Sequence, residues 1–212
     1  MPPSDIFERT FRNYLDQVFL IDLNTIKDKL GFEMDGNDCI ISFFGHPYRI
    51  SSQGINDSHG VRSSYLISVI LCRYLIMCPE VEPKENDWVT YKDFKDAVPF
   101  VGGFLENCEK PISRNFSGHL SELKQICKKM GGRAPQMDLS SDLAMQFEAL
   151  PRIPILMLFN DKDEDFPAKC SILFERRAHR YLDMECLAMI GMAFSDILKK
   201  SDEESSVTTD DS

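Results

Sequence analysis

The sequence predicts an α+β fold, a single domain in which helices pack on one antiparallel sheet of about five strands. Three segments with strand character follow one another without a helix between them, and such consecutive strands favour antiparallel pairing. Segments with helical periodicity precede and follow this group. The central strand segment is the most apolar run of the chain, which suits a strand buried on both faces. The three segments are Ala144–Leu150, Ile153–Phe159 and Lys169–Phe174.

The N-terminal region is predicted to begin with two helices. Ser4 suits the N-cap position of the first helix. The second helix, over residues 23–30, is expected to end at Gly31, because glycine readily takes the left-handed conformation that ends a helix. The apolar face of the first helix repeats at helical spacing and comprises Phe7, Phe11, Leu15 and Val18.

A β-hairpin is expected next. Cys39–Phe44 is rich in β-branched and aromatic residues, and the turn-forming segment Gly45–Pro47 separates it from Tyr48–Ser51. The polar residues 52–60 contain glycines and are expected to form a surface loop. Arg62–Met77 carries apolar residues on most of its sides, which predicts a central, buried helix.

The middle of the chain gives weaker signals. Trp88–Tyr91 suits a short strand, whereas residues 92–115 are expected to be irregular, because prolines and a glycine pair would interrupt a long element. Leu120–Met130 has helical periodicity and is followed by two glycines. A last helix is expected to start at Asp183 and to end near Lys200, whose charge suits the negative end of a helix.

Length and composition fit one soluble globular domain over residues 1–200, followed by an acidic tail over residues 201–212 that is expected to be disordered. The chain has 212 residues, of which 43% are hydrophobic and 27% charged, and its formal net charge is −10. The tail holds five acidic residues and no basic one. Because the chain has no stripe of basic residues, neither nucleic acid nor an anionic membrane is an expected partner.

A cytoplasmic location is expected. The N-terminus lacks the charged and then apolar pattern of a secretory signal. No apolar run approaches the ~20 residues that a membrane-spanning helix needs. The seven cysteines are scattered and no two of them have CxxC spacing, so reduced thiols are expected rather than disulfides.

No motif predicts a metal site or a catalytic centre, so no metal, cofactor or catalytic residue is assigned. Asp161–Asp165 places acids at alternate positions, as in a calcium loop, but Phe166 and Ile172 stand where that loop needs glycine and glutamate. The four histidines lack zinc-site spacing. The basic cluster Arg176–Arg180 could bind a phosphate or a carboxylate, and a solvated surface turn is the simpler interpretation.

One set of residues is the best candidate for a ligand site. Trp88 beside the Tyr48-Arg49 strand would line an apolar pocket that also offers hydrogen-bonding groups. Core packing is the alternative interpretation. The glycine pair before Phe104 would let a ligand approach the backbone closely, and a plain turn is the alternative there. The candidate site therefore comprises Tyr48, Arg49, Trp88, Gly102 and Gly103.

Three stretches of the sequence together resemble one family. They are Gly45–Ser51, Asp87–Tyr91 with its continuation through Gly103-Phe104, and the region from Ala149 to Phe174. The family is an uncharacterised domain of unknown function, numbered thirty-seven eighty-six, which occurs in bacteria and archaea, many of them anaerobes. Members of the family that the chain resembles are sometimes fused to a small iron–sulfur cluster domain like that of corrinoid iron–sulfur proteins. The resemblance implies a setting in anaerobic cofactor or one-carbon metabolism, although this chain has no clustered cysteine motif.

Three hypotheses about function follow. The first is a cytosolic binding or accessory module with a corrinoid or iron–sulfur protein as its partner, as the resemblance implies. The alternative is an enzyme with a pocket near Tyr48, Trp88 and Gly102. The third is a structural metal site made from the scattered histidines and cysteines. An enzyme should show a deep pocket with convergent polar groups, whereas an accessory module should show an exposed apolar patch.

Overall fold

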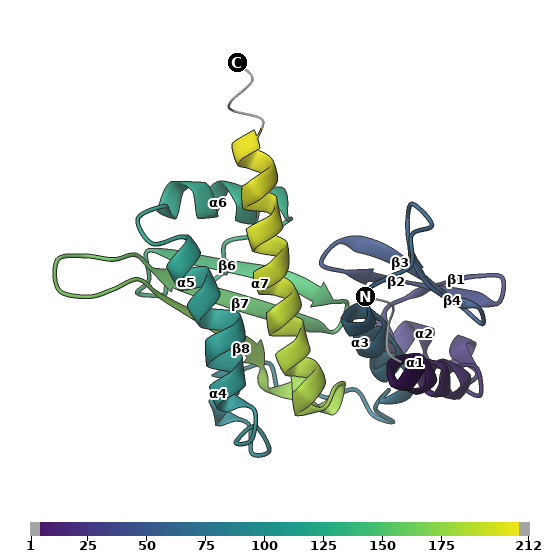
Figure 1. Cartoon of the computed structure of the whole chain (residues 1–212). Coiled ribbons are helices and arrows are strands. Elements are labelled where there is room, and N and C mark those ends of the chain that lie inside the picture. The colour runs from purple at the N-terminus through teal and green to yellow at the C-terminus, as the bar shows by residue number, and fades with distance from the viewer. Residues whose placement is uncertain (1–4, 208–212) are drawn as a thin grey trace.

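The computed structural model describes residues 5–207 and contains two four-stranded antiparallel sheets with helices packed on them (Figure 1). The predicted α+β class and the antiparallel pairing are therefore confirmed. The strands form two sheets, however, instead of one sheet of about five strands. The chain order explains the division, because helix α3 (Tyr65–Ile76) and the connection after it separate the strands of the first sheet from those of the second.

The first sheet is a meander of four strands. The predicted hairpin forms its centre, where fully buried residues alternate with half-buried ones along β2. The loop prediction for residues 52–60 is wrong in part, because Ile55 buries its side chain and pairs with Ile50 in a further strand. In spatial order the strands are β1 (Glu33–Asp35), β2 (Asp38–Phe43), β3 (His46–Ser51) and β4 (Gly54–Asp57).

Three helices lie on one side of the first sheet (Figure 1). The end of α2 is confirmed, because Gly31 adopts the left-handed conformation and its N–H bonds to the Lys27 carbonyl oxygen. Helix α1 packs against α3, whose residues are buried on most sides. The predicted N-cap of the first helix, Ser4, lies outside the described residues. The helices are α1 (Asp5–Val18), α2 (Leu23–Leu30) and α3 (Tyr65–Ile76).

The second sheet contains the three strands predicted as the core, joined by β5 at one edge. Consecutive residues of the central strand β7, namely Ile155, Leu156 and Met157, are fully buried, as expected of a strand covered on both faces. In spatial order the strands are β5 (Trp88–Thr90), β8 (Lys169–Glu175), β7 (Ile153–Asn160) and β6 (Leu143–Leu150).

Helix α7 (Met184–Val207) and a helical segment over residues 101–115 lie side by side across the second sheet (Figure 1). The predicted last helix is thus confirmed, and α6 (Leu120–Lys129) is the helix expected in that region. Helix α7 continues past residue 201, where the acidic tail was predicted to begin, and residues 208–212 of that tail lie outside the described part. Within residues 5–207 no helix combines the length and the apolarity needed to cross a membrane.

Residues 101–115 form a continuous helix, so the prediction of irregular structure is wrong for them. The centre of this helix is a π-helical turn, η2 (Leu105–Glu109), between α4 (Val101–Phe104) and α5 (Lys110–Asn115). Pro111 explains the turn, because proline has no N–H to donate and its ring clashes with the carbonyl group four residues earlier. The helix widens there, and the Lys110 N–H bonds to the Leu105 carbonyl oxygen, five residues back.

The turn between β2 and β3 joins the two sheets. Its residues Phe44 and Gly45 have φ angles of 48° and 78°, as in the tight turns that match the twist of a hairpin. The Phe44 N–H donates to the Ala149 carbonyl oxygen at 3.0 Å. Ala149 lies at a bulge in β6, where the pairing with β7 is interrupted. The Phe44 ring stacks on Phe194 of α7 with ring centroids 5.5 Å apart, so the hairpin tip contacts both the second sheet and its helix.

An ion pair forms a second link between the two halves of the chain. Arg73 Nη2 on α3 lies 2.7 Å from Asp183 Oδ2, just before α7. Asp183 also caps α7, because it accepts a hydrogen bond from the Cys186 N–H at 2.8 Å. Burial alone would raise the pKa of Asp183, but the Cys186 N–H and the Arg73 guanidinium outweigh that effect and the pKa is lowered.

Phe44→Ala is expected to lower the free energy of unfolding by about 3–5 kcal/mol, because it removes a buried aromatic ring from a packed site. Urea denaturation followed by circular dichroism measures this change. Phe166→Ala is the matched control, because Phe166 is 70% exposed and its loss should change stability by less than about 0.5 kcal/mol. Equal effects of the two substitutions would contradict the role of Phe44 in joining the sheets.

Asp183→Asn is expected to lower the free energy of unfolding by about 1 kcal/mol at neutral pH, because asparagine still caps α7 but leaves Arg73 without its ion-pair partner. The pKa of Asp183 is lower in the folded chain than its ordinary value. The contribution of the ion pair is therefore complete above the unfolded-state pKa, which is about 4, and is lost as pH falls through the folded-state pKa.

The stability difference between wild type and Asp183→Asn should accordingly shrink in acid, as urea titrations at several pH values would show. Asp138→Asn removes the same charge at an exposed position and serves as the control. A difference for Asp183→Asn that stays constant into acid would show that the charge of Asp183 does not contribute.

Candidate functional site

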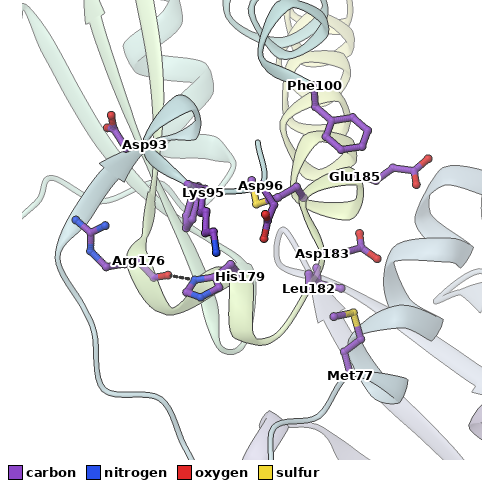
Figure 2. Close-up of a pocket in the computed structure, with 12 residues that line it drawn as sticks. Met77, Asp93, Lys95, Asp96, Phe100, Arg176, His179, Leu182, Asp183 and Glu185 are labelled. Atoms are coloured by element: carbon purple, nitrogen blue, oxygen red, sulfur yellow. Dashed lines mark hydrogen bonds between the residues drawn. The ribbon is translucent and has the colours of Figure 1, made fainter. Parts of the chain in front are cut away.

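A pocket of about 640 Å³ lies at the start of α7 (Figure 2). We call it the α7 pocket. Its walls come from η1 (Tyr91–Asp93) and the loop after it, from η3 (Arg176–Arg180), and from the residues around the first turn of α7. Met77, just after α3, contributes a further side chain. The pocket therefore depends on segments from both halves of the chain.

Apolar side chains form the floor of the α7 pocket. Leu182 is fully buried, and Phe94 and Met184 are each 6% exposed. Tyr91 fixes the backbone of Met184, because its hydroxyl donates to the Met184 carbonyl oxygen at 2.6 Å. The Tyr91 ring stacks on Phe104 with ring centroids 4.2 Å apart. The floor is therefore continuous with the core of the second sheet and offers an apolar surface to a ligand.

Several charged side chains at the rim of the α7 pocket already have partners. Arg176 Nε lies 2.8 Å from Asp87 Oδ2. Asp93 accepts hydrogen bonds from the Thr90 N–H and the Thr90 hydroxyl, which fixes the start of η1. Asp183 forms an ion pair with Arg73 of α3. These pairings fix the shape of the pocket, while the remaining N–H groups of the Arg176 guanidinium stay available as donors.

Three other rim residues, Lys95, Asp96 and Glu185, are exposed and form no ion pair or side-chain hydrogen bond within residues 5–207. Figure 2 shows Lys95 and Asp96 over the middle of the pocket, with Glu185 on the side away from Arg176. The rim therefore presents one ammonium and two carboxylate groups whose hydrogen-bonding capacity is available to a bound molecule.

His179 adds a defined hydrogen-bond acceptor to the same rim. Its Nδ1 lies 2.6 Å from the Arg176 carbonyl oxygen (Figure 2). A carbonyl oxygen only accepts hydrogen bonds, so Nδ1 carries the proton and Nε2 is the acceptor in the neutral ring. The ring centroid lies 5.8 Å from that of Phe94 on the floor. His179 can thus accept a hydrogen bond from a ligand that rests on the floor.

Among residues 5–207, no group of three or more histidine, cysteine, aspartate or glutamate side chains is placed to hold a metal ion. The seven cysteines, all within that range, are free thiols. Burial raises the pKa of Cys39, Cys72 and Cys127 to about 12, so these thiols stay protonated at neutral pH.

Two of the five residues predicted from sequence to form a ligand site lie on β3 of the first sheet. Tyr48 packs against the core there and is half buried, with its ring centroid 6.4 Å from that of Phe43. Arg49 forms ion pairs with Asp38 on the neighbouring strand β2 and with Asp35 on β1, the strand beyond it. Arg49 is therefore engaged in pairing the strands at the edge of this sheet.

The other three predicted site residues belong to the second half of the chain. Trp88 lies on β5 and lines a polar groove beside an ion pair in which Arg177 Nε is 2.6 Å from Glu175 Oε2. Gly102 and Gly103 are exposed on α4. The groove contains Trp88 and none of the other four residues, and the α7 pocket contains none of the five.

The residues of the α7 pocket carry little sequence signal. Lys95 and Asp96 fall in the segment that the sequence predicts to be irregular, and Arg176–Arg180 is interpreted there as a surface turn. Asp183 is identified only as the start of a helix. Local patterns do not indicate that these segments, which lie far apart in the chain, meet in one pocket.

Comparison with known protein families gives a match over most of the chain. A family model described as a domain of unknown function (DUF3786) matches residues 22–196. No curated protein and no solved structure matches the chain. The matched range includes all eight strands, the helix over residues 101–115 and every side chain that lines the α7 pocket. The chain therefore belongs to the DUF3786 family of domains of unknown function.

Proposed function

We propose that this protein is a cytosolic binding module that holds a small organic ligand in the α7 pocket. The observation that carries the proposal is an apolar floor beneath charged side chains that have no partner among residues 5–207. A volume of about 640 Å³ lies within the range of pockets that bury most of a small ligand. Polar groups that converge over an apolar floor fix the orientation of such a ligand.

The charges at the rim specify the chemistry of the ligand. Its apolar body would rest on Phe94 and Met184. An acidic substituent would pair with Lys95, and a basic or hydroxyl group would reach Asp96 or the Nε2 atom of His179. The proposed ligand therefore has an apolar body and carries polar groups of both kinds.

The proposal includes an accessory role toward a corrinoid or iron–sulfur protein. This partner comes from the family resemblance and not from the geometry of the α7 pocket. An exposed apolar patch supports a protein partner, because large apolar side chains exposed together are typical of interaction surfaces. Phe7 on α1 is 48% exposed and lies with its ring centroid 4.8 Å from that of Tyr65. Ile6, next to Phe7 in the chain, is 72% exposed, and Val61, shortly before Tyr65, is 61% exposed.

A thermal-shift screen of corrinoids, nucleotides and amphiphilic amino acids is expected to give at least one ligand that raises the melting temperature. A ligand at a concentration of 100 times its Kd adds about 2.7 kcal/mol to the stability of the folded state. Lys95→Ala should weaken the binding of an acidic ligand about tenfold by isothermal titration calorimetry, because a charge-assisted hydrogen bond is lost. Lys124→Ala, at an exposed position on α6, should leave the affinity unchanged.

A ligand whose affinity is the same in wild type, Lys95→Ala and Asp96→Asn would place its binding outside the α7 pocket. A screen without any stabilising compound would count against the binding role itself. Metal analysis and an absorption spectrum of protein purified without oxygen complete the test, since a co-purified corrinoid or cluster would be visible there.

The partner is tested separately. Phe7→Ser combined with Tyr65→Ser is expected to weaken binding to a purified corrinoid iron–sulfur protein about tenfold or more, because aromatic residues dominate the energy of protein interfaces. Surface plasmon resonance measures this affinity. Phe166→Ser is the control, because it removes an exposed aromatic ring elsewhere, one that is even more exposed than Phe7. Equal binding by the double variant and wild type, or no binding by wild type, would remove this partner from the proposal.

A further inference from the structure

A second, smaller pocket lies beside the Tyr91–Phe104 ring pair. Its volume is about 270 Å³. Tyr91 and Phe104 line it, whereas the Tyr91 hydroxyl bonds to the carbonyl group of Met184, which lines the α7 pocket. Polar residues face this second space from three elements, namely Lys92, Glu109 and Lys169. We call it the Glu109 pocket.

The Glu109 pocket exists because β5 is short. This strand pairs with β8 only from Leu173 to Glu175, and after Thr90 the chain turns away into η1. The edge of β8 before Leu173 therefore has no neighbouring strand on that side. There the backbone N–H of Ile172 donates a hydrogen bond to Oε1 of Glu109 at 2.9 Å.

The π-helical turn places Glu109 at this edge. Glu109 is the last residue of η2, where the helix is widened ahead of Pro111. Its Oε2 atom accepts no hydrogen bond from any residue in the part of the chain that the structure describes. Burial raises the pKa of Glu109, and the Ile172 N–H, Lys169 and Lys92 act in the opposite direction.

Two lysines face the glutamate without contacting it. Lys92 and Lys169 are close enough to affect Glu109 electrostatically, but neither forms an ion pair within residues 5–207. Their ammonium groups are exposed and keep their donor capacity. With Glu109 ionised, the three groups carry a net charge of +1, which favours an anion over a cation. The remaining carboxylate oxygen of Glu109 favours a hydrogen-bond donor on the same ligand.

We propose that the Glu109 pocket is a second ligand site, which binds a small carboxylate that also bears a hydroxyl or ammonium group. The carboxylate of the ligand lies toward Lys92 and Lys169, and its donor group lies toward Oε2 of Glu109. The volume of about 270 Å³ restricts the ligand to a few heavy atoms, because it lies below the usual range for larger organic ligands. This site is separate from the α7 pocket and does not depend on the function proposed for it.

Nuclear magnetic resonance titration of the full chain tests this site, with L-alanine and glycolate as probes and acetate as the probe without a donor group. The Ile172 amide is the reporter, because its hydrogen bond to Glu109 changes when Glu109 is engaged. We expect saturable shifts of this signal with L-alanine or glycolate, and binding of acetate that is about tenfold weaker, as the loss of one charge-assisted hydrogen bond predicts.

Three variants separate the roles of the residues. Lys169→Ala should weaken the binding of all probes, whereas Glu109→Gln, which can still accept the Ile172 N–H, should weaken L-alanine about tenfold and leave acetate unchanged or tighter. Lys124→Ala is the control and should change nothing. The proposal is overturned if no probe shifts the Ile172 signal, or if Lys169→Ala and Lys124→Ala have the same effect.

Discussion

The hydrogen bond from the Phe44 N–H to the Ala149 carbonyl oxygen holds together two sheets that share no strand. It forms because a bulge in β6 interrupts the pairing at Ala149, while a tight turn brings the Phe44 N–H to the same place. The ring of Phe44 then packs on Phe194. Met77 in the wall of the α7 pocket comes from one half of the chain, and the remaining walls come from the other half. The shape of the pocket therefore depends on this contact between the two sheets.

The fold class was predictable because its main signals are local. Three apolar segments in series specify the core of the second sheet, and helical periodicity followed by two glycines specifies α6. The division into two sheets depends on contacts between distant residues, such as that of Phe44 with Ala149, which no local pattern reveals. The helix over residues 101–115 was missed because Pro111 normally ends a helix. Here the chain accommodates Pro111 by widening one turn.

The candidate sites were less predictable than the fold. Trp88 does line a groove, but the residues expected beside it lie on another sheet or on α4. Lys95 and Asp96 line a pocket only because η3 and the start of α7 pack opposite them. Glu109 could have been suspected from Pro111 two positions later, since a proline inside a helix often accompanies a functional distortion. That signal requires knowing first that the segment is helical.

The widened turn at Leu105–Glu109 also bears on how this protein can change over generations. A π turn is equivalent to one extra residue inserted into an α-helix. Deleting Glu109 itself and replacing Pro111 would give a regular helix whose two halves still face the second sheet, but the Ile172 N–H on β8 would lose its carboxylate partner. A ligand site at this edge could thus be gained or lost by a change of one codon in length, while the fold around it stays the same.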